Sequence, residues 1–226
     1  GKTKKEKATI EKVNITEICN NNVQLLNSWA KQKRIQFVTI FVEEKQINIS
    51  ASNAHGIFNG IQTLLQLSNQ KKQTAICSII DEPAFSIRGY MFDVGRNYQS
   101  MPLIKQQLDV MAMYKLNAYH MHLTEDIAWR IESKIFRNLT DSSLMIRNKG
   151  KFYTYQELRE LVEYCRTRHI EFIPEIDMPG HSAAFKRATG FDMQSPEGKA
   201  ILKQVLQEFM SEVDVPYFHL GGDEVV

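Results

Sequence analysis

The sequence predicts an α/β protein, in which a small α+β domain (residues 1–82) precedes a larger domain of alternating strands and helices (residues 83–226). After residue 83 the apolar residues change from a mixed pattern to a regular strand–helix rhythm. The tripeptide Asp81-Glu82-Pro83 interrupts the pattern and marks the boundary. Of the 226 residues, 43% are hydrophobic and 24% are charged, which is the composition of an ordinary globular protein.

The first domain shows the pattern of a short sheet covered by one helix. Residues 35–42 are rich in β-branched and aromatic side chains, and residues 46–50 alternate between apolar and polar, so both are predicted strands. The apolar residues of 56–67 fall on one helical face, and residues 74–80 form a further predicted strand. The first nine residues are polar and basic, and we expect them to fray.

Four predicted strands alternate with helices in the second domain. The strands are 87–93, 117–123, 170–176 and 215–220, and the helices are 102–116, 154–169 and 196–210. Thr154 and Glu157 have capping-box spacing, and Ser195 is a candidate N-cap. Helices between successive strands imply parallel pairing. A (β/α)8 barrel contains eight such units, but an open parallel sheet gives the same local pattern, so the pattern alone leaves both architectures open.

Charge and cysteine content exclude several classes of protein. Twenty-eight Lys and Arg against 26 Asp and Glu give a net charge of +2, which argues against a nucleic-acid partner. No apolar run approaches the roughly 18 residues of a membrane helix, so no membrane partner is expected. Cys19, Cys77 and Cys165 lie far apart, which indicates neither a disulfide framework nor a zinc ribbon.

Ionisable residues gather at or just after the predicted strands. Asp223 and Glu224 follow two glycines after the last strand, where they are suited to general acid–base chemistry, although a charged turn has the same composition. Asp177 and His181 follow the preceding strand in a loop stiffened by prolines. A carboxylate beside an imidazole sets its tautomer and raises its basicity, so this pair also indicates a functional site.

The two remaining candidates are a histidine pair and an arginine. His120 and His122 are two residues apart and therefore point to the same side of one strand, where they would line a pocket or bind a metal. No third ligand stands at an obvious position, so no metal site is predicted. Arg88 begins a buried strand and needs a partner, which would be Asp93, another carboxylate or a ligand.

Five motifs in a fixed order resemble glycoside hydrolase family 20, the β-N-acetylhexosaminidases. The matching segments are residues 56–67 of the small domain, Arg88-Gly-Tyr-Met-Phe-Asp93-Val-Gly-Arg96, His120-Met-His122-Leu-Thr-Glu125-Asp126 with Trp129-Arg130, Pro174-Glu-Ile-Asp177-Met-Pro-Gly-His181 and His219-Leu-Gly-Gly-Asp223-Glu224. The similarity covers most of the chain from about residue 35. The resemblance implies a small α+β domain followed by the first four β/α units of a (β/α)8 TIM barrel.

The resemblance also implies an activity, which is the removal of terminal β-linked N-acetylglucosamine or N-acetylgalactosamine from glycans with retention at the anomeric carbon. In this family the substrate's own acetamide oxygen attacks C1 and forms an oxazolinium intermediate. By resemblance, Glu224 is the general acid and base, Asp223 holds the acetamide N–H, and Arg88 binds the sugar hydroxyls at positions 3 and 4. Supporting residues near the acid would be Asp177, His181 and Glu125. The resemblance implies no metal, no cofactor and a periplasmic, secreted or lysosomal location.

The chain departs from the family pattern in three ways. Glu125-Asp126 stands where the family often has two aspartates, and Ile127-Ala128 replaces a more polar Gln-Gly pair. The family's remaining barrel strands would lie beyond Val226, so we expect a fragment with an incomplete pocket. Such a fragment would show no turnover by itself and would form homo-oligomers through its exposed barrel edges. Two alternatives stay open, namely a metal-dependent hydrolase that uses His120 and His122, and a non-catalytic fragment that binds sugar or a partner.

Overall fold

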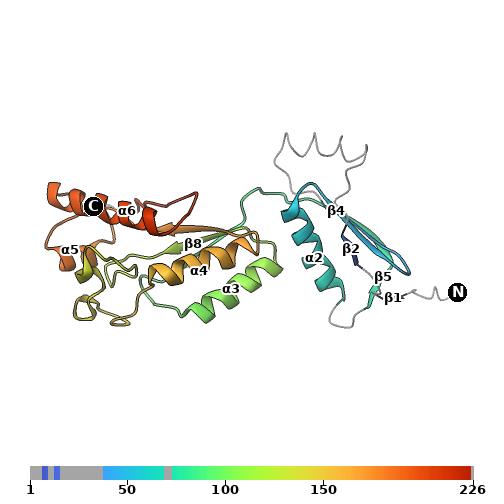
Figure 1. Cartoon of the computed structure of the whole chain (residues 1–226), viewed down its shortest axis with the longest axis horizontal. Coiled ribbons are helices and arrows are strands. Elements are labelled where there is room, and N and C mark those ends of the chain that lie inside the picture. The colour runs from blue at the N-terminus through green and yellow to red at the C-terminus, as the bar shows by residue number, and fades with distance from the viewer. Residues whose placement is uncertain (1–6, 10–12, 16–37, 69–72, 225–226) are drawn as a thin grey trace. The chain divides into compact units, whose positions relative to one another are not determined.

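The computed structural model describes residues 7–9, 13–15, 38–68 and 73–224. The chain divides into two compact units. The first unit is Gly1–Arg88 with Met113–Lys115, and the second is Gly89–Ala112 with Leu116–Val226. Figure 1 shows a sheet with helix α2 in the first unit, and a sheet with several helices in the second. Among the described residues, no helix combines the length and the apolar character needed to cross a membrane.

The first unit is built on a four-stranded sheet of order β2-β4-β3-β6. These strands are β2 (Val13–Ile15), β3 (Val38–Val42), β4 (Ile47–Ala51) and β6 (Cys77–Asp81). Strand β3 pairs antiparallel with β4 and β6, whereas β2 runs parallel to β4. The strands predicted at 35–42 and 46–50 are confirmed as β3 and β4, except that residues 35–37 lie outside the described part of the chain. The single strand predicted at 74–80 is instead divided between β6 and β5 (Gln73–Ala75), which belong to different sheets.

A second, antiparallel pair joins β1 (Lys7–Thr9) to β5 (Gln73–Ala75). The expectation that the first nine residues fray is therefore wrong for residues 7–9. Their polar and basic composition predicted a loose terminus, but pairing with β5 satisfies their backbone groups.

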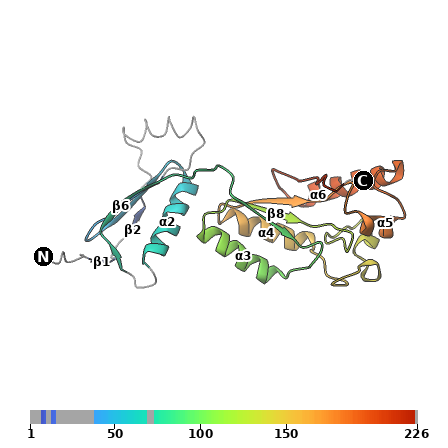
Figure 2. The same ribbon diagram turned by 180° about the vertical axis from the view of Figure 1, so that it is seen from behind.

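Helix α2 (Ala54–Ser68) packs on one face of the four-stranded sheet (Figure 2). Alternate residues of a strand point to one face, and the buried core collects those residues together with one leucine of the helix. The core consists of Val38, Ile40, Val42, Ile47, Ile49 and Leu64. The helix approaches closely at Gly60, where a Cβ would lie 2.8 Å from Cγ2 of Ile49 and 2.9 Å from Cγ2 of Val38.

The second unit contains three parallel strands in the order β7-β8-β9. The strands are β7 (Gly89–Asp93), β8 (Ala118–His122) and β9 (Glu171–Glu175). Helices α3 (Met101–Met113) and α4 (Tyr155–Arg166) connect them, and α5 (Ala183–Thr189) and α6 (Pro196–Glu212) follow β9. The short 3-10 helices η1 (Arg137–Thr140) and η2 (Ser142–Leu144) lie between β8 and α4. The predicted parallel strand–helix alternation is confirmed for these three strands.

Both predicted helix caps are present. Thr154 Oγ1 accepts from the Glu157 backbone N–H, and the Glu157 carboxylate accepts from the Thr154 backbone N–H. Ser195 accepts from the Gly198 N–H at the start of α6. Helix α5 was not predicted, because it has only seven residues and directly follows a loop rich in proline and glycine.

The fourth predicted strand, 215–220, is not a strand in the structure. It makes an isolated parallel bridge, in which the His219 N–H donates to Pro174 O and the Ile176 N–H donates to His219 O. The preceding hydrogen bond of a parallel ladder would run from the N–H of residue 174 to Tyr217 O, and proline has no N–H to donate. The prediction of four β/α units is therefore corrected to three strands and one bridge.

We predict that Gly60→Ala lowers the free energy of unfolding by about 1 kcal/mol or more. The new methyl group meets two β-branched side chains that have few rotamers, and overpacking of this kind costs roughly 1–3 kcal/mol. Urea denaturation measures the change. On the same helix Leu65 is 61% exposed, so Leu65→Ala should stay within about 0.5 kcal/mol of wild type. A Gly60→Ala protein as stable as wild type would contradict the prediction and show that Ile49 and Val38 can move to accommodate the methyl group.

Candidate active site

The register of the parallel sheet aligns three ionisable residues at the carboxyl ends of the strands. Asp93 pairs with His122, and His122 pairs with Glu175, so the three side chains form one row on one face. His120 lies two residues before His122 and shares that face. The predicted same-side placement of the two histidines is confirmed, because His120 Nε2 and His122 Nδ1 lie 2.5 and 3.1 Å from Glu175 Oε2.

Glu175 is a buried carboxylate held between these imidazoles. Burial raises the pKa of its carboxyl group, but hydrogen bonds from His120 and His122 outweigh burial and bring the pKa far below its usual range. Burial also lowers the pKa of His122, and the Glu175 carboxylate outweighs it and raises that pKa. Sequence reasoning did not select Glu175. The signal was available, since Glu175 lies two residues before Asp177 in the Pro174–His181 motif.

A second group lies just beyond the strand ends. His181 Nδ1 is 2.6 Å from Asp177 Oδ2, and His181 Nε2 is 3.0 Å from Glu224 Oε2. Asp177 is fully buried, whereas the Glu224 side chain is 75% exposed. The Asp177 backbone N–H donates to Thr124 Oγ1, and Asp177 Oδ1 accepts from the Gly222 N–H. A buried carboxylate thus holds an imidazole whose other nitrogen faces an accessible carboxyl group.

Two glycines let the chain pass directly over Asp177. Gly221 has a φ of +68°, and a Cβ there would lie 1.7 Å from Asp177 Oδ1. Gly222 has a φ of +116°. His181 and Glu224 also have positive φ angles, 46° and 50°, which L-amino acids rarely adopt. Glycine at position 221 thus permits a close approach to the Asp177 side chain.

Arg96 joins the two groups. Its Nη1 lies 2.6 Å from Asp93 Oδ2, and its Nη2 lies 2.7 Å from Glu125 Oε1 and 3.3 Å from His181 Nε2. Glu125 is buried, and its Oε1 is 3.7 Å from His181 Nε2. Arg96 stands in the same motif as Arg88, but the sequence analysis predicts a site role only for Arg88. The position of Arg96 three residues after the end of a strand was the available signal.

Arg88 does not join this group, and Asp93, one of the three partners expected for it, pairs elsewhere. It precedes β7 at the amino end of the strand, where its Nε donates to Lys115 O over 2.8 Å and its Nη1 donates to Phe85 O over 2.7 Å. Five strand residues at about 3.3 Å each separate that end of β7 from the carboxyl end. Asp93 pairs instead with Arg96.

The charges around His181 favour its protonated form. Burial lowers the pKa of the imidazole, but hydrogen bonds to Asp177 and Glu224, together with the Glu125 charge, outweigh burial and raise it. A protonated imidazole donates from both nitrogens, which matches the carboxylates found at each, whereas the positive charge of Arg96, 3.3 Å from Nε2, opposes protonation. Asp223 lies farther away, since its Oδ2 is 3.9 Å from His181 Nδ1 and its side chain is 66% exposed.

Three sets of ligand atoms in the described residues lie close enough to hold a cation. They are His120 with Glu175 and His219, His122 with Asp177 and His181, and Glu175 with Asp177 and Asp223. The first has the nitrogen and oxygen donors that zinc and similar metals prefer. Its atoms already interact within the protein, because His219 Nδ1 accepts from the Gly221 N–H and lies 3.3 Å from Glu175 Oε1. The chain therefore supplies His219 as the third donor that the sequence alone did not indicate beside His120.

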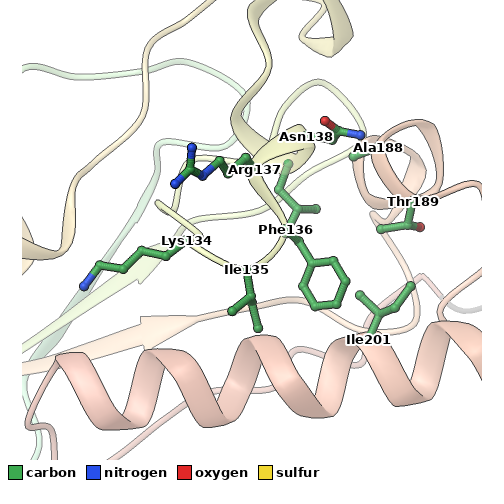
Figure 3. A pocket seen from close by; sticks show the side chains of 9 residues that line it. Lys134, Ile135, Phe136, Arg137, Asn138, Ala188, Thr189 and Ile201 are labelled. Atoms are coloured by element: carbon green, nitrogen blue, oxygen red, sulfur yellow. The ribbon is translucent and has the colours of Figure 1, made fainter.

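A separate pocket lies between the 134–139 segment, the end of α5 and helix α6 (Figure 3). Phe136 and Ile201 lie close together in this view, whereas Lys134 and Arg137 extend away from them. None of the residues that line this pocket belongs to the groups around Glu175 and His181. We therefore place the candidate active site at the strand ends.

The geometry defines an acid–base centre at the carboxyl ends of a parallel α/β sheet, where such enzymes keep their catalytic groups. Residues 85–194 match the model of the glycosyl hydrolase family 20 catalytic domain, and residues 3–82 match that of domain 2 of the same family. The chain belongs to glycosyl hydrolase family 20.

Relatives of known structure and sequence agree with this assignment. The chain is 37% identical over 218 residues to a β-hexosaminidase of Porphyromonas gingivalis, covering 80% of this chain and 28% of the relative. It is 33% identical to a β-hexosaminidase of Vibrio furnissii, covering 81% of this chain and 36% of that one. The β-N-acetylhexosaminidase structure from Bacteroides fragilis superposes with a TM-score of 0.77 at 32% identity, covering 84% of this chain and 43% of that one. The chain thus spans about a third of the length of the curated relatives.

We predict that Asp177→Asn lowers the pKa of His181. The Asp177 carboxylate stabilises the imidazolium, so its removal lets His181 lose its proton at lower pH. Proton NMR titration of the imidazole Hε1 signals, assigned with His181→Gln, measures this pKa. Asp214 pairs with Arg166 and is 93% exposed, so Asp214→Asn should leave the His181 titration unchanged. An unchanged pKa in Asp177→Asn would mean that Glu224 and Glu125 alone set it.

Proposed function

We propose that this chain carries the acid–base half of a β-N-acetylhexosaminidase site, which hydrolyses terminal β-linked N-acetylglucosamine or N-acetylgalactosamine from glycans. One observation carries the proposal: His181, held by the buried Asp177 carboxylate, contacts the exposed carboxyl group of Glu224 through its other nitrogen. It lies in a chain whose family relatives are β-hexosaminidases. The structure of the Vibrio harveyi relative, described as a complex with N-acetylglucosamine, has a TM-score of 0.79 at 27% identity and supports this substrate class.

Glu224 is the proposed general acid and base. Its exposed carboxyl group protonates the glycosidic oxygen as the bond to C1 breaks, and the resulting carboxylate then takes a proton from the attacking water. His181 Nε2 faces that carboxyl group at 3.0 Å, so an N–H there stabilises the charged form. Asp177 fixes the orientation of the imidazole from its other nitrogen.

We further propose that the reaction is retaining and substrate-assisted. In this scheme the acetamide oxygen attacks C1 to give an oxazolinium, and water reopens it. Asp223 and Glu224 are adjacent in sequence, which disfavours their use as an acid and a nucleophile on opposite sides of one sugar. Asp223 is therefore assigned to hold the acetamide N–H and to balance the developing positive charge. Its 66% exposed side chain is free to face a ligand.

Arg96 replaces Arg88 as the proposed arginine for the sugar hydroxyls. Its guanidinium lies at the carboxyl ends of the strands, contacts Glu125 and His181, and remains 48% exposed. The planar fork of arginine suits two neighbouring hydroxyl groups. Glu125 supports this placement, because one of its oxygens lies within 4 Å of both Arg96 and His181.

The domain organisation belongs to the same proposal. Residues 1–82 form the accessory domain, and residues 83–226 belong to a (β/α)8 catalytic domain. Tyr90 and Met91 of β7 are exposed, and within the described residues β7 pairs only with β8, which supports self-association through this edge. An extracytoplasmic location, whether periplasmic, secreted or lysosomal, is proposed from the family resemblance alone.

We predict that Glu224→Gln lowers kcat/KM for nitrophenyl N-acetyl-β-glucosaminide at least about 100-fold, the low end for loss of a general acid–base group. The assay compares polypeptides that contain residues 1–226. Glu160 lies exposed on α4 and outside the site, so Glu160→Gln should keep wild-type turnover. Wild-type turnover in Glu224→Gln would remove Glu224 from the mechanism. A folded wild type that neither turns over nor binds N-acetylglucosamine would argue for the non-catalytic alternative.

We predict that Arg96→Lys raises KM for the same substrate at least about tenfold, because lysine cannot reproduce two parallel hydrogen bonds. Arg88→Lys serves as the matched variant, and it should leave KM within twofold of wild type since its guanidinium binds backbone carbonyls at the opposite end of β7. A rise in KM for Arg88→Lys with none for Arg96→Lys would restore the original assignment.

A further inference from the structure

Arg130 is a fully buried arginine whose guanidinium donates to backbone carbonyls and one sulfur. Its exposed fraction is 0%. The acceptors are Val94 O at 3.2 Å, Gly95 O at 3.3 Å, Arg147 O at 2.9 Å, Asn148 O at 3.1 Å, Lys151 O at 2.8 Å and Met145 Sδ at 3.6 Å. A buried guanidinium requires full hydrogen bonding to offset its loss of water, and here five carbonyl dipoles supply it.

These carbonyls belong to two loops that are far apart in sequence. Val94 and Gly95 open the loop that follows β7, and the remaining carbonyls belong to residues 147–151 before α4. Arg130 itself is fixed, because its N–H donates to Leu123 O and its carbonyl accepts from the Tyr153 N–H. The guanidinium therefore ties both loops to the segment that follows β8.

Other contacts between the same two loops run along the β7 loop. Arg147 Nη1 donates to Arg96 O at 3.3 Å, and the Tyr98 N–H donates to Asn148 Oδ1 at 3.1 Å. The Tyr153 hydroxyl donates to Gln99 O at 2.7 Å and accepts from the Gln99 N–H at 3.3 Å. Several backbone groups of residues 94–99 are thus held by hydrogen bonds. Arg130 holds the first two residues, Val94 and Gly95, which directly precede Arg96.

The backbone before Arg96 is clamped from two sides. The N–H groups of Val94 and Gly95 both donate to His122 O, while their carbonyls accept from Arg130. Gly95 also lies against the next strand's loop, since a Cβ there would be 2.8 Å from Glu125 Cβ. A shift of this dipeptide moves the adjoining backbone of Arg96, from which the guanidinium reaches Glu125.

We propose that Arg130 is a positioning residue, which locks the Val94–Gly95 backbone and thereby holds the Arg96 guanidinium against Glu125 and His181. Lysine cannot replace it, because an ammonium group has three donors where five carbonyls need partners. The effect on catalysis rests on the proposed function, whereas the effect on the loop does not.

Hydrogen exchange tests the loop directly, without any need for turnover. In Arg130→Lys we expect the amides of residues 94–99 to exchange at least tenfold faster, with the amides of β8 unchanged. Arg159 is an exposed arginine that pairs with Glu212, so Arg159→Lys should match wild type throughout. Wild-type exchange at residues 94–99 in a folded Arg130→Lys protein would overturn the proposal.

A double-mutant cycle separates positioning of Arg96 from general destabilisation. Arg130→Lys should lower kcat/KM about tenfold in the wild-type background, since small misplacements of catalytic groups have effects of this size or larger. In the Arg96→Lys background the same change should cost less than twofold. Equal losses in both backgrounds would overturn the link to Arg96. If folded wild type neither turns over nor binds N-acetylglucosamine, the proposed function fails, and the exchange experiment still decides whether Arg130 locks the loop.

Gly95→Ala provides a second variant if Arg130→Lys does not fold. The added methyl group pushes the same dipeptide away from Glu125 and leaves the guanidinium of Arg130 in place. We expect the same loss of kcat/KM, again reduced below twofold when Arg96→Lys is present. Wild-type kinetics in Gly95→Ala would show that the position of this backbone does not matter to Arg96, which contradicts the proposal.

Discussion

Parallel pairing of β7, β8 and β9 is the constraint on which the candidate site depends. The register places Asp93, His122 and Glu175 in one row at the carboxyl ends. Each strand then continues into a loop that carries the next ionisable residues, including Arg96 and His181. A shift of one residue in any strand would turn its side chains to the opposite face of the sheet. The arrangement of charges at the site therefore depends on the register of the backbone pairing.

Buried charge is stabilised in three different ways in this unit. Glu175 lies between two imidazoles, Asp177 accepts from a backbone N–H and faces His181, and Arg130 donates to backbone carbonyls. Each solution replaces the lost hydration with directed hydrogen bonds, as buried ionised groups require. The exposed carboxyl group of Glu224 rests on this network and contacts it through His181.

The sequence predicted the elements better than their contacts. Periodicity and caps located α4 and α6, because the capping pairs Thr154–Glu157 and Ser195–Gly198 are local. The motifs also located Asp177, His181 and Glu224, which the structure brings together. Arg88 and Arg96 stand in one motif, and only the direction of β7 shows which of them reaches the strand ends. Likewise, the fourth strand is interrupted by a hydrogen bond that Pro174 cannot donate. The pairing of residues 7–9 depends on a strand more than sixty residues away.

The left-handed backbone at His181 and Glu224 means that, at these two positions, a substitution that stabilises the fold would remove a group of the candidate site. Both residues have positive φ angles, where an L-amino acid costs of order 1 kcal/mol relative to glycine. Glycine would relax the backbone at either position, and it would also remove the imidazole or the carboxyl group. A screen that selects this polypeptide for thermal resistance alone would therefore tend to enrich variants that have lost the two groups facing each other across the site.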